Sequence, residues 1–313
     1  MNKKYLLYAG IFFVTTLIFF GAAFLYRQNS NAGIVRGEYA FAHTRNNLRM
    51  LSRIWLKSPE SEAINLYSKN GEWHFKEAKD YFVNTGHLAN FYTTLNNALI
   101  KMVYPATPQT LEHHQLTSST GTQVITYDNT GKILDKLIIG SRYDDDSVYA
   151  YFAQNKGYYY IIGPVGPFSG EPTDWIPYPL LSIDEFLIRR LIIRNQNYEG
   201  QKLSDLLKHS YKMQRVLDVL SFIGYNGVTA KAELSSEITN QSEPHTFDIV
   251  MRNGLIYKFE IYKIDDLYWL SINLKADKIS RKEVPPFVRQ NQKYFADWLF
   301  LLDTRQGKIL YDI

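Results

Sequence analysis

The sequence of 313 residues contains no cysteine. This absence excludes disulfide bonds, thiolate metal sites, covalent haem attachment and cysteine nucleophiles. Because a chain without cysteine is compatible with any redox compartment, the composition does not decide where the protein resides.

The sequence also lacks a strong excess of charge of either sign. Its formal net charge is +4, with 35 basic and 31 acidic residues, and Lys3 and Lys4 supply two of the positive charges. A protein that binds nucleic acid through its surface usually carries a basic patch or stripe. The near balance gives no electrostatic case for nucleic acid as a partner.

One long apolar run is present, from Tyr5 to Tyr26, without a charged residue. A helix rises about 1.5 Å per residue, so roughly 20 apolar residues cross the hydrocarbon core of a bilayer. The run is too long for the apolar region of a cleaved signal, and no small-residue cleavage site follows it. We therefore predict an uncleaved signal anchor that spans the membrane at residues 5–26.

The flanks of this run decide its orientation only weakly. Lys3 and Lys4 precede it, and Arg27, Arg36 and Arg45 follow it. Positive charges near a span favour the cytoplasm, but large following domains cross the membrane largely regardless of charge. We expect the short tail inside and the long C-terminal part in the periplasm of a bacterial inner-membrane protein.

The region after the anchor reads as strands and hairpins around one helix. Apolar residues at helical spacing predict a helix from His87 to about Met102. Turn residues between alternating apolar runs predict hairpins at residues 70–71, 128–131 and 155–157. A helix with one apolar stripe needs an opposing sheet face. The stripe expected to be buried consists of Leu88, Phe91, Leu95 and Leu99.

Much of this order recurs later in the chain. Residues 190–194 resemble 53–57, and Gly254 follows Gly131 at a separation of 123 residues. A second helix is predicted at 203–223, and its end resembles residues 99–104 at a separation of 121. Solenoid repeats are about 20–50 residues long, so this period indicates a duplicated domain. The second stripe expected to be buried consists of Leu206, Met213, Val216 and Leu220.

We therefore predict an α+β fold. An N-terminal transmembrane helix is followed by two similar units of mainly antiparallel sheet, each packed with one long helix. The predicted divisions are the anchor at 1–27, a linker at 28–47, a first unit at 48–183 that ends in a proline-rich crossover, and a second unit at 184–313 with the C-terminal segment.

The order of motifs resembles a known family. After the anchor come Asn70-Gly71-Glu72-Trp73, Asp80-Tyr81-Phe82-Val83-Asn84, Leu137-Ile138-Ile139-Gly140, Trp175 and Leu180-Leu181-Ser182-Ile183. This arrangement is similar to the bacterial domain-of-unknown-function family 4340 over most of residues 48–302, although Phe82 stands where the family usually has proline. The resemblance implies a duplicated α+β extracytoplasmic domain, and brings no catalytic residues. Some relatives accompany ABC-type transport components, which implies an accessory role at the membrane.

Three segments could carry chemistry, and each has a plainer interpretation. Glu112-His113-His114 lacks the spacing by which a helix places two histidines on one metal. Asp144-Asp145-Asp146 lacks the glycine and spread ligands of a calcium loop, and indicates a solvated turn. The glycine-rich stretch 163–170 matches neither a dinucleotide fingerprint nor a P-loop. The sequence predicts no catalytic residue, no cofactor and no metal site.

Clustered tyrosines are the best local candidate for a binding face. Rigid aromatic side chains anchor interfaces, but they also stabilise ordinary sheets through cross-strand pairs. The possible partner-binding face consists of Tyr149, Tyr151, Tyr158 and Tyr160.

The leading hypothesis is a membrane-anchored, non-enzymatic periplasmic scaffold or accessory subunit of a cell-envelope assembly. Its partners would be the membrane, through residues 5–26, and other envelope proteins, ABC-type transport components among them. The alternative is an envelope enzyme or glycan-binding module whose site forms only in three dimensions, because paired carboxylates need proximity rather than linear spacing.

Overall fold

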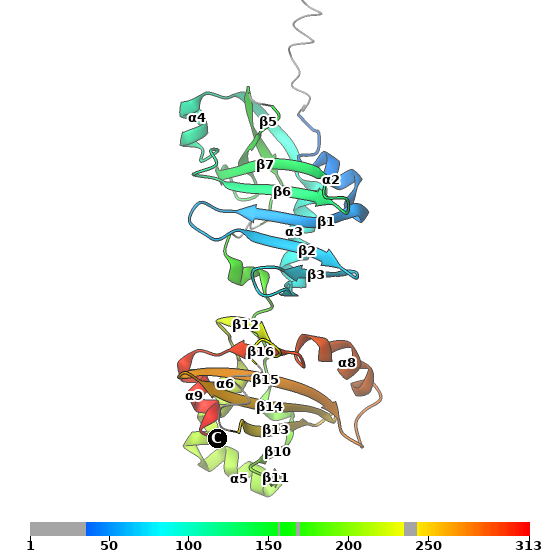
Figure 1. The fold of residues 1–313 in the computed structure, drawn as a ribbon, viewed down its shortest axis with the longest axis vertical. Helices are drawn as coiled ribbons and strands as arrows, with labels where there is room; N and C mark the ends of the chain where they lie inside the picture. Colours follow the sequence, from blue (N-terminus) through cyan, green and yellow to red (C-terminus); the bar gives the residue numbers. More distant parts are fainter. Residues whose placement is uncertain (1–35, 156, 167–169, 235–242) are drawn as a thin grey trace, which may run out of the picture. The chain divides into compact units, whose positions relative to one another are not determined.

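The computed structural model describes residues 36–155, 157–166, 170–234 and 243–313 (Figure 1). The fold is α+β, with two sheets whose strand pairs are antiparallel, and with few helices. The predicted class, α+β with mainly antiparallel sheet, is confirmed. Among the described residues no helix is long and apolar enough to cross a bilayer. The predicted span at 5–26 lies outside these residues.

The first sheet has nine strands in the order β4-β3-β2-β1-β6-β7-β8-β9-β5. Its strands are β1 (Leu51–Lys57), β2 (Ile64–Lys69), β3 (Glu72–Phe75), β4 (Tyr81–Phe82), β5 (Leu99–Pro105), β6 (Thr122–Asp128), β7 (Ile133–Arg142), β8 (Val148–Phe152) and β9 (Tyr158–Gly163). Its region also contains α2 (Ala42–Asn46), η1 (Leu48–Met50), α3 (Thr85–Asn97) and α4 (Pro108–His113).

The second sheet has seven strands in the order β11-β10-β13-β14-β15-β16-β12. Its strands are β10 (Ile188–Ile193), β11 (Gln196–Glu199), β12 (Gly227–Ala230), β13 (His245–Met251), β14 (Leu255–Ile264), β15 (Leu267–Ala276) and β16 (Trp298–Leu301). The helices of this part are η2 (Pro172–Trp175), η3 (Glu185–Leu187), α5 (Gln201–His209), α6 (Tyr211–Ser221), α8 (Val284–Asn291), η4 (Gln292–Tyr294) and α9 (Thr304–Tyr311).

The two sheets share one strand order. Across the first sheet, seven neighbouring strands lie in the order β2, β1, β6, β7, β8, β9 and β5. Their counterparts across the second sheet are, in the same order, β11, β10, β13, β14, β15, β16 and β12. The corresponding strands also follow one another in the same order along the chain. Pairing is irregular at the start of the matching strands, before Arg53 in β1 and before Arg190 in β10. Strands β3 and β4 have no counterpart among the described strands of the second sheet.

Turn chemistry explains the hairpins. Asn70 and Gly71 both have positive φ, 54° and 82°, which a two-residue turn between twisted strands requires. Gly131 and Gly254 also have positive φ, 84° and 87°, in the β6–β7 and β13–β14 turns. Both glycines are thus placed where a left-handed conformation suits a residue without Cβ.

The predicted long helices are not present as such. Helix α3 ends at Asn97, and Leu99–Pro105 forms β5, which pairs with β9. The predicted second helix is divided into α5 and α6 at Ser210, which has an extended backbone. The Ser210 hydroxyl accepts a hydrogen bond from the amide of Met213 at 3.2 Å and thereby caps α6. The resemblance of residues 99–104 to residues 220–225 does not reflect a shared structure, since the first segment lies in β5 and the second contains the last turn of α6 and the loop after it.

The predicted apolar stripes are mostly buried. Leu88, Phe91 and Leu95 in α3 are at most 6% exposed, and so are Met213, Val216 and Leu220 in α6. Leu99 and Leu206 are half-buried.

The segment predicted as a linker, 28–47, is structured in its described part. Phe41 and Thr44 are fully buried, and the amide of Gly37 donates to the carbonyl of Ile100 at 2.8 Å. Phe41 is a core residue, and the polar, glycine-containing stretch 28–37 does not indicate that the residues after it are packed.

Grouped by their contacts, the described residues form two compact units. One contains the residues up to Ala63 together with Ala89–Gly170, and the other contains Ile64–Leu88 together with Glu171–Ile313. Within the second unit, Tyr81 is buried against Trp298 and Phe300, with ring centroids at 4.9 and 5.6 Å. The ranges 48–183 and 184–313 contain the strands of the first and the second sheet, respectively.

Candidate binding surface

The tyrosines singled out in the sequence lie on two opposite faces of the first sheet. Tyr149 and Tyr151 alternate with the buried Val148, Ala150 and Phe152 along β8. Tyr160 pairs with Ala150 across β9 and is fully buried, so it contributes no surface. Tyr158, two residues before Tyr160 on the same strand, shares its side of the sheet by alternation. The structure therefore brings Tyr149 and Tyr151 together and separates them from Tyr158 and Tyr160.

Other rings join Tyr149 on its face. The ring of His114 stacks on Tyr149, with centroids 3.8 Å apart, and Tyr104 stacks on Tyr159 at 5.3 Å. Tyr149 and Tyr159 are 6.0 Å apart, which links the two stacks. Tyr143 meets Tyr149 edge-on at 5.6 Å. We call these five residues, Tyr104, His114, Tyr143, Tyr149 and Tyr159, the aromatic cluster.

A short helix and its exit loop place His114 on the sheet. Helix α4 starts with Thr107 as N-cap, whose hydroxyl accepts from the amide of Thr110 while the Thr110 hydroxyl accepts from the Thr107 amide. After the helix, Gln115 turns the chain with a φ of 58°. The carbonyl of His114 then accepts from the amide of Ser141 in β7 at 3.0 Å.

Gly140 makes this docking possible. A Cβ at this position would lie 2.0 Å from the carbonyl oxygen of His114 and 3.1 Å from that of Gln115. Only a residue without a side chain lets the loop approach the strand this closely. Gly140 thereby fixes the height of the His114 ring above Tyr149.

The environment disfavours the charged forms of His114, Tyr149 and Tyr159. Burial lowers the pKa of His114 below its ordinary 6.5, and the neighbouring His113 adds to the effect. Burial, with the nearby tyrosines, raises the pKa of Tyr149 and Tyr159. At neutral pH the cluster offers π faces and hydroxyl groups that donate and accept hydrogen bonds. This chemistry suits binding.

The cluster reaches the solvent at its rim. Tyr104 is 36% and Tyr143 44% exposed, whereas Tyr159 is 8% exposed and Tyr149 is half-buried. Rings that already pack against other rings, and that remain exposed at their edges, lose little conformational entropy on binding.

The acidic turn beside the cluster is held by a lysine. Lys101 Nζ lies 2.7 Å from Asp146 Oδ1 and donates to the Ser147 hydroxyl at 2.7 Å. The Lys101 ammonium and the Ser147 hydroxyl hold the pKa of Asp146 down at about 2. Among the described residues, no group of three or more histidines and carboxylates is arranged to hold a metal ion.

The partner-binding face predicted from the sequence contains one member of this cluster, Tyr149. Tyr159 could have been found by alternation once the register of β8 with β9 was known. His114 was seen only as part of Glu112-His113-His114, because its place depends on the contact of a loop with Gly140.

Comparisons with known proteins do not assign a function to this surface. No family model, curated protein or solved structure matches the chain.

Proposed function

We propose that the chain is a membrane-anchored, non-enzymatic scaffold or accessory subunit of a bacterial cell-envelope assembly, with its folded part in the periplasm. The proposal uses the uncharged run at 5–26 for the anchor. The observation that carries the binding role is the aromatic cluster, because tyrosine is enriched among the residues that contribute most of the binding energy at interfaces. The resemblance to family 4340 suggests ABC-type transport components as partners.

We also infer that the two sheets arose by duplication. Their shared strand order, the irregular pairing before Arg53 and Arg190, and the glycine turns at 131 and 254 all support this inference. Unrelated segments rarely match in connectivity, pairing irregularity and turn position together.

The second candidate function is a glycan-binding module. The observation that favours it is the pair of parallel stacks, His114 on Tyr149 and Tyr104 on Tyr159, because the faces of sugar rings pack well on aromatic rings. An envelope enzyme is the other form of this alternative, and it would require a nucleophile or an acid–base pair. Soluble peptidoglycan fragments, tested by calorimetry, separate a glycan ligand from a protein partner.

The anchor and its orientation are tested by fractionation and reporters. The full chain should remain in membranes after a carbonate wash, and a chain that begins at Ser30 should be released. Alkaline phosphatase fused after residue 40 should be active, since this enzyme matures only outside the cytoplasm. Extraction of the full chain by carbonate would refute the anchor, and an inactive fusion would refute the orientation.

The binding role is tested by co-purification from mild detergent. Replacing Tyr104 and Tyr143 by alanine removes the two exposed rings of the cluster while leaving the buried ones. The matched control replaces the exposed Phe186 and Ile279, which lie in the second unit. We expect the first variant, and not the control, to lose recurrent envelope partners. Equal recovery from both variants would contradict a role for the cluster.

A further inference from the structure

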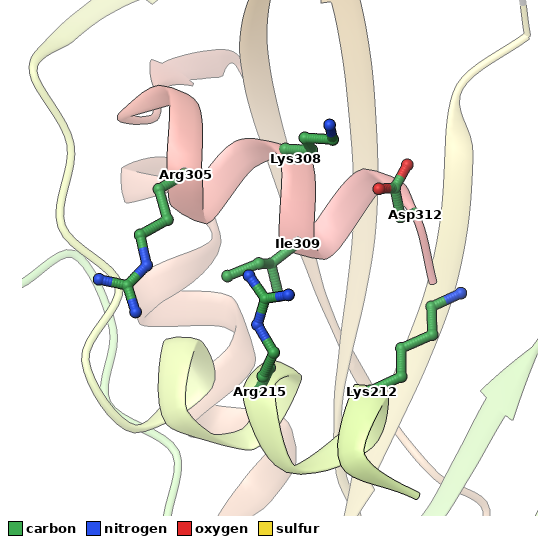
Figure 2. A pocket seen from close by; sticks show the side chains of 6 residues that line it. All are labelled: Lys212, Arg215, Arg305, Lys308, Ile309 and Asp312. Atoms are coloured by element: carbon green, nitrogen blue, oxygen red, sulfur yellow. The ribbon is translucent and has the colours of Figure 1, made fainter.

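A basic groove lies between two helices of the second unit. Helices α6 and α9 pack against each other, and a hollow of about 510 Å³ opens along them. Its lining residues are Lys212, Arg215, Arg305, Lys308, Ile309 and Asp312. In Figure 2, Arg215 extends from α6 toward α9 beside Ile309, and Arg305 extends from α9 toward α6.

Helical spacing gathers these cations. Lys212 and Arg215 are three residues apart on α6, as are Arg305 and Lys308 on α9, so the members of each pair are neighbours on their helix. All four side chains belong to exposed residues. Like charges at this spacing repel each other and destabilise the helix that carries them. This repulsion lowers the stability of the two helices, and an anion bound in the groove would remove it.

Few acidic groups offset them. Among the residues that the structure describes, none of the four cations forms an ion pair within 4.0 Å. Asp312 is the carboxylate of the groove, and Asp218 and Asp303 line the adjoining hollow. Asp303 Oδ1 is already engaged, because it accepts from the amides of Arg305 and Gln306 at 2.9 Å and caps α9.

We propose that this groove binds a ligand that carries two phosphate groups. Within the groove, four cations face one carboxylate, an excess of three positive charges that Asp218 and Asp303 in the adjoining hollow reduce. Two phosphate groups supply about two negative charges as diesters and about three to four as monoesters. The forked guanidinium groups of Arg215 and Arg305 match phosphate oxygens in pairs, and the lysines add mobile ammonium groups. The volume is within the range of about 300–1,000 Å³ found for small-ligand pockets. The site goes beyond the proposed scaffold role and does not depend on it.

The test is calorimetry on the full chain in uncharged detergent with inorganic pyrophosphate. In R215Q/R305Q we expect the dissociation constant to rise about tenfold or more, because charge-assisted contacts are lost. The matched control is R281Q/R289Q, which removes the same charge from two exposed arginines outside the groove and should change it less than about threefold. Thermal unfolding checks that both variants remain folded.

Each outcome decides the proposal. A short-chain diphosphatidylglycerol that binds and is lost in R215Q/R305Q identifies a lipid headgroup, whereas binding of pyrophosphate alone identifies a soluble ligand. Absence of binding by both, or equal loss in both variants, overturns the site. Tighter binding of a glutamate-rich peptide than of either phosphate ligand overturns the ligand class.

Discussion

The two sheets have the same strand order and different surroundings. Along the chain, helix α3 precedes β5, the edge strand of the first sheet. Two helices, α5 and α6, precede β12, the edge strand of the second sheet. The loop that docks on Gly140 belongs to the first sheet, and the basic groove belongs to helices of the second unit. Strand order is fixed by pairing and by the buried faces, and both candidate sites use elements in which the two halves differ.

The largest expected effect tests whether the two cores are equivalent. Leu95 in α3 and Leu220 in α6 are 0% and 1% exposed. We expect Leu95→Ala and Leu220→Ala each to lower the free energy of unfolding by about 2–5 kcal/mol, because each leaves a cavity. Urea unfolding followed by circular dichroism measures both. The exposed Ile133→Ala is the control, with a change below about 0.5 kcal/mol.

If the halves unfold separately, each leucine variant should shift a different transition. A loss below about 1 kcal/mol at either leucine would show that its helix is not part of a packed core.

The next effect concerns the close approach of the His114 loop to Gly140 in the first sheet. Gly140→Ala would place a methyl group 2.0 Å from the carbonyl of His114, so the loop must move. We expect a loss of about 1–3 kcal/mol in the free energy of unfolding, together with a changed near-ultraviolet signal from the rings of the aromatic cluster. Gly157→Ala is the matched control, because nothing lies within 4 Å of its added Cβ. Identical unfolding curves for the two variants would refute the close approach.

A smaller effect is the pH dependence contributed by His114. Its folded pKa lies below the ordinary 6.5 because burial disfavours the charged ring. The stability linked to this group is therefore fully present above pH 6.5 and is lost as the pH falls through the folded value. His114→Phe keeps an aromatic ring on Tyr149 and removes the titration. We expect its stability to fall less steeply below pH 6.5 than that of the wild type.

Equal slopes in the two proteins, measured by urea unfolding at a series of pH values, would contradict this cause. Because the sign is fixed by the direction of the pKa shift, a steeper fall in the variant would contradict it as well.

The smallest effect compares two equivalent turns. Lys101 pairs with Asp146 beside the β7–β8 turn, and Lys263 pairs with Asp266 at the β14–β15 turn, both at 2.7 Å. Each aspartate is exposed, and exposed pairs contribute little because water and salt screen them. We expect D146N and D266N to leave the midpoint of thermal unfolding at pH 7 unchanged. A clear decrease in one alone would show that the two ion pairs contribute differently to stability.

Sequence patterns predicted what depends on local chemistry. The turns at Asn70-Gly71, Gly131 and Gly254 were found because positive φ demands particular residues. The β10–β11 turn was missed, since Arg194 and Asn195 take positive φ without a glycine. The apolar period of α3 continues through Leu99 and so predicts helix where the structure has β5, because the pairing of β5 with β9 is a contact distant in sequence.

The site was less accessible to the same reasoning. Alternation along β8 correctly puts Tyr149 beside Tyr151 on one face, but the register of β9 decides on which face Tyr160 lies. A shift of one residue moves every side chain to the other face, and no local pattern fixes that register. The basic groove combines two helices that are far apart in the sequence, so its four cations looked like ordinary charged positions.

The edge strands have a consequence for the kinetics of folding during synthesis. β5 leaves the ribosome before β6, β7 and β8, yet its partner β9 comes after them, and β12 waits in the same way for β16. Each nascent half must therefore hold a strand that lacks its partner in the sheet, β5 in the first half and β12 in the second, until its last strand emerges. Such non-local closure slows folding and exposes strand edges to other chains. Synonymous codons that delay translation between β5 and β9 should prolong this exposed interval without changing the final structure.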